Sequence, residues 1–211
     1  MKAFEHGQPF GCPCHPISGV PVVSPGMDSE NRKRIKHLDI PNHAHELTFS
    51  CYKNYPLLSF DPPRIWLLDA LNVARNQLNY AVLAFVIMPD HAHVIVYPRA
   101  RDYSISLFLK SVKQSVSRKA ADWFPAYKPE WQGKLTVYRS DGTKAFKFWQ
   151  AGGGYDRNIT GRRTLERMIE YIHRNPVRKG LVADPHEWKW SNCYARERAT
   201  GLTLDIDEAP W

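Results

Sequence analysis

Two histidines separated by one residue, His91 and His93, have side chains that could take part in chemistry together. Alternate side chains of a β-strand point to the same face, so both imidazoles would share a face if this segment is a strand. Such a pair suits a divalent cation, although two unrelated histidines at a strand end would show the same spacing. The chain holds a second such pair, His43 and His45. We favour His91 and His93 as metal ligands because they adjoin the most apolar segment of the chain.

A tyrosine and an asparagine form the second candidate pair. Tyr171 and Asn175 lie one turn apart on a predicted helix and therefore on one helix face. An asparagine can offer its carbonyl oxygen to a hard cation, and a tyrosine can act as a nucleophile. A free phenol ionises only near about pH 10, so it would need cations nearby, and Arg167 and Arg174 are the nearest candidates. With nine other tyrosines in the chain, helix geometry alone favours the simpler interpretation of Tyr171 as a packed aromatic beside Ile172.

The charge of the chain favours a polyanionic partner. The 211 residues include 29 Lys and Arg against 21 Asp and Glu, which gives a net charge of +8. The isoelectric point is about 9.4. Such a surface favours nucleic acid, although charge also serves solubility. We predict contacts to a phosphate backbone from Lys110 and Lys113, which share a helix stripe, and from Arg157, Arg167 and Arg174.

A series of strands and helices must position these side chains. Alternating β-formers indicate strands, and apolar residues at every third or fourth position indicate helices. The expected elements are, in order, a strand at 46–52, a helix at 64–77, strands at 80–88 and 91–97, a helix at 104–124, a strand at 146–149 and a helix at 164–174. Asp61 is the expected N-cap of the first helix, and Asp141-Gly142 suggests a short hairpin. This order predicts an α+β fold, a ferredoxin-like antiparallel sheet with helices on one face.

The chain divides into three predicted parts. Residues 1–40 contain five prolines and little periodicity, so we expect an irregular extension. The domain itself is expected over 41–196, with Trp188 and Trp190 docking its end, and 197–211 is expected to be a tail.

The composition indicates a reducing compartment. Four cysteines in a chain of this length do not make a disulfide framework. The longest wholly apolar run has eight residues, whereas a helix that spans a bilayer needs about 20. No signal sequence is visible at the start. We therefore expect a cytoplasmic protein with no membrane partner.

Several segments resemble one family. The segment VIMPDHAHVIVYP resembles the HUH-motif strand of single-tyrosine HUH transposases, in which two histidines flank a hydrophobic residue. The segments FWQAGGGYDRNI, EYIHRNPVRKGLV and HEWKWSNCYAR resemble the C-terminal half of one branch, the REP-associated tyrosine transposases. ELTFSCYKNYPLL matches the first strand of that branch. The resemblance covers about residues 43–195 in matching order and spacing.

The resemblance implies a fold, a site and a reaction. It implies the HUH endonuclease form of the ferredoxin-like fold, with His91, His93 and Asn175 as ligands of Mg²⁺ or Mn²⁺ and Tyr171 as the nucleophile. The expected activity is cleavage and rejoining of single-stranded DNA, at the foot of a hairpin or palindromic end, through a 5′-phosphotyrosine intermediate in DNA transposition. Related transposases act as monomers or as homodimers, so the oligomeric state stays open. The alternatives are a non-catalytic single-stranded nucleic-acid-binding protein with the same fold, or a metal-dependent hydrolase that uses water.

Overall fold

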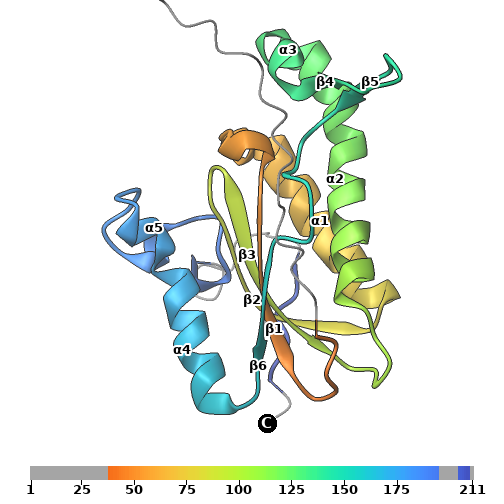
Figure 1. Cartoon of the computed structure of the whole chain (residues 1–211). Helices are drawn as coiled ribbons and strands as arrows, with labels where there is room; N and C mark the ends of the chain where they lie inside the picture. Colours follow the sequence, from red (N-terminus) through yellow and green to blue (C-terminus); the bar gives the residue numbers. More distant parts are fainter. Residues whose placement is uncertain (1–37, 195–203, 210–211) are drawn as a thin grey trace, which may run out of the picture. The chain divides into compact units, whose positions relative to one another are not determined.

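A four-stranded antiparallel sheet forms the centre of the fold, seen in a computed structural model that describes residues 38–194 and 204–209 (Figure 1). Its strands are β1 (Ala44–Ser50), β2 (Tyr80–Ile87), β3 (His91–Pro98) and β6 (Tyr155–Ile159), in the spatial order β2-β3-β1-β6. Helix α1 (Asp61–Gln77) joins β1 to β2, and helix α2 (Ile105–Tyr127) follows β3. This strand order and connectivity are those of a ferredoxin-like α+β fold, which confirms the expected class.

The described residues belong to one of two units of the chain. The contacts within the chain divide it into the units Met1–Lys33 and Arg34–Trp211, and the described residues lie in the second unit. The extension predicted over 1–40 therefore lies almost wholly outside the described residues, as do most of the predicted tail residues. Among the described residues, no helix is long and apolar enough to cross a membrane.

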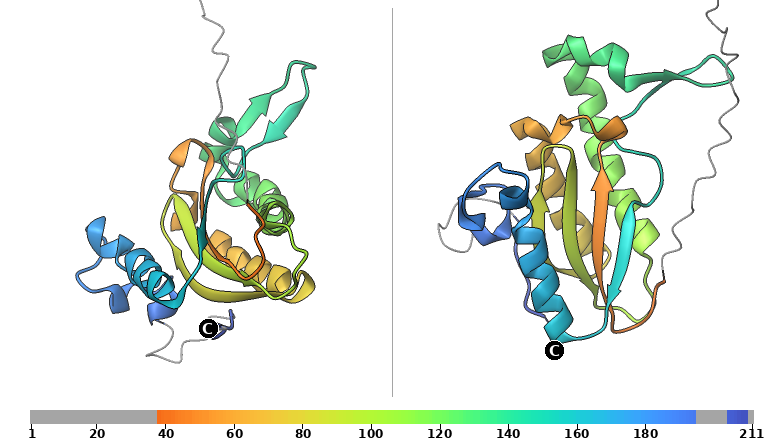
Figure 2. Two further views of the ribbon diagram at one scale, coloured as in Figure 1. Left: turned by 60° about the horizontal axis from the view of Figure 1, so that its bottom comes forward. Right: turned by 60° about the vertical axis from the view of Figure 1, so that its left-hand side comes forward.

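Helices cover both faces of the sheet, so the prediction of helices on one face is wrong in this respect (Figure 2). Strand β2 is buried along its whole length, and its side chains alternate between two apolar clusters. Phe85 and Ile87 share one cluster with α1 and α2, as expected, whereas Val86 shares the other with Leu165 of helix α4 (Arg162–His173). The helix that carries Tyr171 therefore lies opposite the other two long helices.

The prediction of a strand at 146–149 is wrong. Residues Lys144–Phe146 form β5, which pairs with β4 (Thr136–Tyr138) in a separate hairpin, and the turn between them contains Asp141-Gly142 as expected. Phe148 and Trp149 are buried in the core from a loop, where their burial produced an apolar pattern like that of a strand. The fourth strand of the sheet is instead β6, whose polar side chains suit an edge strand.

Two helix boundaries also differ from expectation. The N-cap of α1 is Phe60, and Asp61 is the first helical residue, where its carboxylate accepts a hydrogen bond from Arg64 (3.3 Å). Helix α4 begins at Arg162, two residues before the expected start, and ends at His173; a separate short helix, α5 (Asn175–Arg178), follows it. The remaining elements are η1 (Tyr52–Asn54), η2 (Leu57–Ser59), η3 (Pro129–Trp131), α3 (Gln132–Leu135) and η4 (Pro185–Glu187).

C-terminal segments cover the outer edge of β2. Trp190 is buried, and its carbonyl oxygen accepts a hydrogen bond from the Ile87 backbone (2.8 Å). The Trp188 indole donates to the carbonyl oxygen of Ile87 (3.0 Å), so both tryptophans dock as expected. Further along, the backbone N–H of Asp207 donates to the Val82 carbonyl oxygen (2.9 Å). An edge strand with unpaired backbone groups invites association with other chains, and these contacts satisfy several of them.

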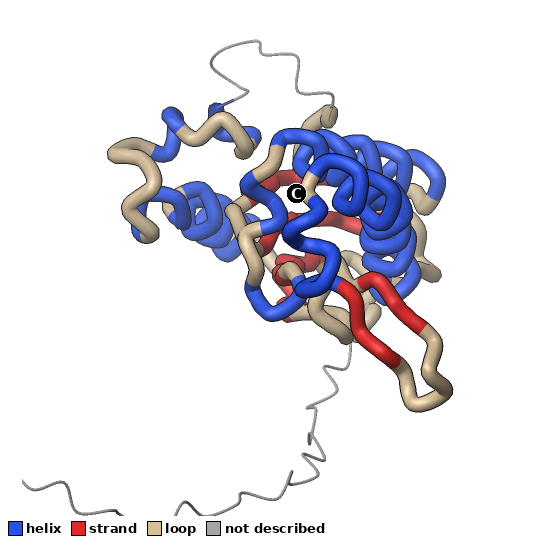
Figure 3. The backbone as a smooth tube through the Cα atoms, turned by 90° about the horizontal axis from the view of Figure 1, so that it is seen from above, coloured by secondary structure: helices blue, strands red, loops and turns tan. Residues whose placement is uncertain are grey.

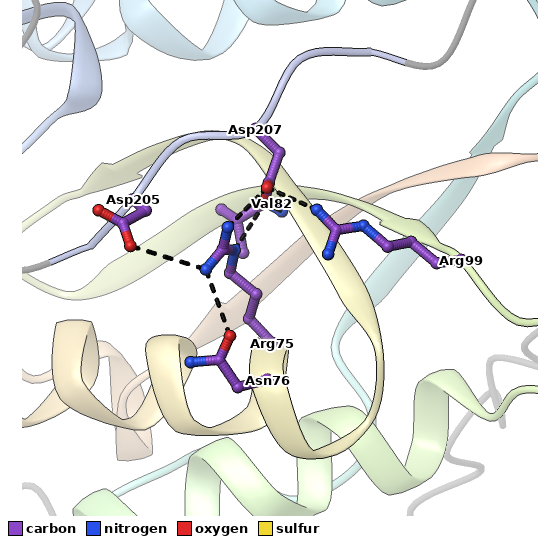
Figure 4. Close-up of polar contacts among 6 residues, drawn as sticks. All are labelled: Arg75, Asn76, Val82, Arg99, Asp205 and Asp207. Atoms are coloured by element: carbon purple, nitrogen blue, oxygen red, sulfur yellow. Dashed lines mark hydrogen bonds and ion pairs between the residues drawn. The ribbon is translucent and has the colours of Figure 1, made fainter.

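The carboxylate of Asp207 holds the last described segment, 204–209, against β2 and α1 (Figure 4). Its carboxylate accepts hydrogen bonds from the Arg75 guanidinium (2.6 Å to both oxygens), from Arg99 (2.6 Å) and from the Val82 backbone N–H (2.9 Å). Burial raises the pKa of Asp207, but the hydrogen bonds from Arg75 and Val82 outweigh it, so the pKa lies below its ordinary value.

We predict that Asp207→Asn lowers the free energy of unfolding at neutral pH by about 2 kcal/mol, because charge-assisted hydrogen bonds are lost. A carboxyl group whose pKa is lower in the folded than in the unfolded state stabilises the fold at a pH above its unfolded-state pKa. This contribution disappears as the pH falls through the folded-state pKa. The difference between wild type and Asp207→Asn should therefore shrink in acid. Urea unfolding at neutral and acid pH measures it. Asp205→Asn is the control, since Asp205 is largely exposed and 3.8 Å from Arg75; an equal loss there would contradict the assignment.

Candidate active site

Strand pairing arranges polar side chains in rows on the sheet face that α4 covers. Thr48 of β1 pairs with His93 of β3 on one side and with Tyr155 of β6 on the other. One row further along, Glu46 pairs with Arg157. Because alternate residues of a strand share a face, these five side chains project from the same side of the sheet.

Helix α4 completes a cavity over these rows. It contributes residues spaced by three or four positions, which therefore form one helix face. The cavity has a volume of about 730 Å³, and it is lined by Glu46, Thr48, His93, Tyr155 and Arg157 from the sheet and by Thr164, Arg167, Met168 and Tyr171 from α4. Four predicted site residues, His93, Tyr171, Arg157 and Arg167, thus share one cavity. The other five, His91, Asn175, Lys110, Lys113 and Arg174, do not belong to this lining.

Hydrogen bonds fix the orientation of the His93 ring. Nδ1 of His93 lies 2.7 Å from the Thr48 hydroxyl and 3.1 Å from a Glu46 carboxylate oxygen. The Thr48 hydroxyl donates its single hydrogen to that same Glu46 oxygen (2.7 Å). Nδ1 must therefore carry a hydrogen and donate it, which leaves Nε2 of His93 as the nitrogen that can bind a metal ion.

His91 is held in the same way. Its Nδ1 donates to a carboxylate oxygen of Asp90 (2.7 Å), and its ring centre lies 4.9 Å from that of His93. Burial lowers the pKa of His91 and outweighs the hydrogen bond to Asp90. The ring is therefore neutral near pH 7 and offers Nε2, as a metal ligand must. The charge of Lys179, just after α5, also lowers the pKa of His91, so the end of α5 lies within electrostatic range of the histidines.

The second histidine pair has a different role. His45 is fully buried, and both ring nitrogens are engaged, Nδ1 with Asp156 (2.8 Å) and Nε2 with the Tyr103 hydroxyl (2.9 Å). No nitrogen of His45 is left to bind a metal ion. His43 contacts the Asn158 amide (3.2 Å). The geometry therefore favours His91 and His93 over this pair.

Arg178 links the two candidate residues of the α4–α5 junction. Its guanidinium lies 4.0 Å from the centre of the Tyr171 ring, close enough for a cation–π contact. The same group donates to the Tyr171 carbonyl oxygen and to Oδ1 of Asn175 (3.1 Å). Tyr171 itself is 48% exposed, which does not suit a packed core aromatic. The interpretation of Tyr171 as a buried aromatic is therefore wrong.

The donor set fits a divalent cation. Oδ1 of Asn175 accepts a hydrogen bond from Arg178 and retains a lone pair that a cation could use, whereas the amide nitrogen is a donor and cannot bind a cation. Across residues 38–194 and 204–209, no three side chains of His, Cys, Asp and Glu converge as a metal site. A cation on His91 and His93 would therefore need a third protein ligand of another residue type, and Asn175 stays the prediction for that ligand.

The remaining predicted cations lie elsewhere. Lys110 and Lys113 line a separate groove of about 660 Å³ beside α2. The Lys113 ammonium donates to the carbonyl oxygens of Gly152 (2.7 Å) and Gln150 (3.3 Å), and burial lowers its pKa to about 8. Lys113 thus holds the glycine loop in place. Arg174 forms an exposed ion pair with Glu170 (3.4 Å).

Three residues of the candidate site escaped the sequence analysis: Glu46, Thr48 and Arg178. Glu46 and Thr48 are recognisable only after β1 is paired with β3, because their partner His93 is far away in the chain. Arg178 follows Tyr171 by seven positions, a two-turn helical spacing that could have pointed to it.

Gly154 is a position where only glycine fits. Its φ is +79°, and a Cβ there would lie 2.2 Å from the carbonyl oxygen of Thr48, the residue that orients His93. Gly152 has a similarly positive φ of +96° but open space around it. We predict that Gly154→Ala destabilises the fold by at least about 2 kcal/mol more than Gly152→Ala. Both substitutions place a side chain on a left-handed backbone conformation, but only the methyl group of an alanine at 154 would clash with β1. Denaturant unfolding measures both variants, and equal losses would contradict the predicted contact.

Comparisons with known proteins agree with this fold. Residues 47–175 match the family model described as transposase IS200 like. A Haemophilus influenzae protein whose name places it among REP-associated tyrosine transposases is 21% identical over 165 residues, which cover 75% of this chain and 88% of that protein. A solved structure of a REP-associated tyrosine transposase bound to a REP hairpin superimposes with a TM-score of 0.60 at 18% identity, over 82% of this chain and 92% of that one.

Proposed function

The chain belongs to the IS200-like transposase family, and we propose that it cleaves and rejoins single-stranded DNA with Tyr171 as its nucleophile. One observation carries this proposal. An exposed tyrosine on α4 lines the same cavity as an oriented histidine, His93, and two arginines, Arg157 and Arg167. The cavity thus combines a nucleophile with cations that can bind a phosphate.

We propose that His91, His93 and Asn175 hold Mg²⁺ or Mn²⁺. Each histidine has Nδ1 engaged and Nε2 open to a ligand, which supports this set. A bound divalent ion would neutralise the charge that grows on the non-bridging oxygens of the scissile phosphate. The carboxylates of Glu46 and Asp90 would act through the histidines, by fixing the ring orientations.

Tyr171 would attack the phosphorus in line with the departing 3′ oxygen. A phosphorus–oxygen bond to the phenol forms as the bond to the 3′ oxygen breaks; the phenol loses its proton and the 3′ oxygen gains one. Arg157 and Arg167 would bind the phosphate and Arg178 would hold the tyrosine ring. The resulting 5′-phosphotyrosine exchanges one phosphoester for another, so a second 3′ hydroxyl can reverse the step and join strands without ATP.

We propose that the substrate is a single strand at the foot of a DNA hairpin or palindromic end. The solved relative is bound to a REP hairpin, which supports this substrate class.

The proposal is tested by incubating the full chain with labelled hairpin DNA carrying a single-stranded foot and with Mn²⁺. We expect a labelled protein band that survives denaturing electrophoresis, together with a free 3′ end. DNA binding without cleavage would favour a non-catalytic binding protein. Cleavage without a covalent band would favour a hydrolase that uses water.

A further inference from the structure

The β4–β5 hairpin and the segments that flank it carry a group of cations that the proposed active site does not use. Figures 1 and 3 show the hairpin extending beyond the end of α2 and away from the sheet. The segment 127–147 contains five cationic residues and two acidic ones. We define the ribbon surface as Tyr138 together with the five cations, Lys128, Lys134, Arg139, Lys144 and Lys147.

Over residues 38–194 and 204–209, no acidic side chain neutralises the cations of the ribbon surface. None of the five forms an ion pair with any residue in the part of the chain that the structure describes. One of the two nearby carboxylates, Asp141, is occupied by hydrogen bonds from the backbone and hydroxyl of Thr143 (2.8 and 2.6 Å) inside the turn. The positive charge of the ribbon is therefore available to a partner.

Aromatic rings hold three of these cations in place, among them Lys128, whose ammonium lies 5.0 Å from the Phe60 ring centre. The Lys134 ammonium lies 4.7 Å from the Trp131 ring centre, and the Lys144 ammonium lies 5.7 Å from that of Tyr138. Tyr138 is 71% exposed on a strand that has little other apolar surface. Tyr127, beside Lys128 at the end of α2, is 68% exposed as well. Uncompensated cations beside isolated exposed aromatic rings are typical of nucleic-acid contacts, whereas a protein interface would need a larger apolar centre.

The ribbon surface is continuous with the active-site cavity along the chain. Lys147 follows β5 and also lines the groove formed by α2 and the glycine loop. The same segment then passes Gly154, which touches β1 at Thr48, and enters β6 at Tyr155 in the active-site cavity. The segment that follows Lys147 therefore joins the ribbon surface to the strand that lines the cavity.

We propose that the ribbon surface binds the phosphate backbone of the duplex stem of a hairpin whose single-stranded foot lies in the cavity. A two-stranded antiparallel ribbon has the width to enter a major groove or follow its edge. This inference rests on the proposed function for the position of the foot, but the contact to the stem is a separate property of β4 and β5.

The test uses the full chain and two DNA probes, a hairpin with a single-stranded foot and the foot alone. The variant Lys134→Gln/Arg139→Gln/Lys144→Gln removes three exposed charges. We expect its Kd for the hairpin to rise roughly tenfold or more and its log–log salt slope to decrease by about 2 to 3. Binding of the foot alone should not change. The control Arg101→Gln/Lys119→Gln/Lys189→Gln removes the same charge from exposed positions outside the ribbon and should retain hairpin affinity.

The outcomes separate the two proposals. Unchanged hairpin binding in the ribbon variant, or an equal loss on both probes or in the control, would overturn the stem contact. A wild-type chain that binds the stem through the ribbon but forms no covalent adduct would overturn the proposed function and leave the stem contact standing. Thermal unfolding of each variant verifies that β4 and β5 remain folded. If the triple variant unfolds the ribbon, the single variant Arg139→Gln takes its place, with a smaller rise in Kd for the hairpin and a smaller decrease in salt slope expected.

Discussion

Replacing Tyr171 with phenylalanine is expected to abolish DNA cleavage and covalent-complex formation while leaving folding and DNA binding intact. The substitution removes only the phenol oxygen and retains the ring on which the Arg178 guanidinium packs. The loss in cleavage rate should be on the order of 10⁴-fold or more, as is typical when a nucleophile is removed. Single-turnover cleavage of labelled hairpin DNA measures the rate, and a filter-binding titration measures the affinity.

Tyr155→Phe is the matched control. Tyr155 lines the same cavity and is 50% exposed, so it is the other tyrosine placed to reach a bound phosphate there. We expect this variant to retain cleavage within about tenfold, through lost contacts to DNA alone. Cleavage that persists in Tyr171→Phe and disappears in Tyr155→Phe would transfer the role of nucleophile to β6.

Replacing His93 with alanine should have the second-largest effect. The buried ring is oriented by Thr48 and Glu46 and presents Nε2, so its removal should take away one of three metal ligands. Metal affinity should fall at least about 10- to 100-fold, and cleavage should fall with it. Titration of the protein with Mn²⁺, followed by electron paramagnetic resonance, measures binding apart from activity.

His43→Ala provides the control, because it alters the other His-x-His pair, at a half-buried position near the start of β1. It should retain Mn²⁺ binding and cleavage. Equal Mn²⁺ affinity in wild type and His93→Ala would contradict the metal-site assignment, even if His93→Ala cleaves slowly for another reason.

The sequence predicts the fold well where the signal is local. The apolar run of β2, the alternation in β3 and the spacing within α2 each follow from one segment, and together they give the ferredoxin-like order. The wrong strand at 146–149 arose because Phe148 and Trp149 are buried from a loop, and burial alone does not distinguish a loop from a strand. The true edge strand β6 is polar because β1 shields only one of its edges.

The candidate site is predictable only in part, for the same reason. The spacing of His91 and His93 by itself predicts that their side chains share a strand face. Glu46, by contrast, comes next to His93 only through the pairing of β1 with β3. Lys113 makes a contact that its place in the sequence does not predict. It shares a helix stripe with Lys110, which suggested a DNA contact, but its ammonium is bonded to carbonyl oxygens of the glycine loop. A tertiary contact of this kind cannot be read from helical spacing.

The most direct test of the central proposal is to identify the residue that carries DNA in the covalent complex. After nuclease trimming and trypsin digestion, we expect the nucleotide mass on the peptide Met168–Arg174, whose only tyrosine is Tyr171. The same mass on Phe148–Arg157, which contains Tyr155, would contradict the assignment of the nucleophile. A cleaved strand with no modified peptide would contradict the covalent mechanism itself.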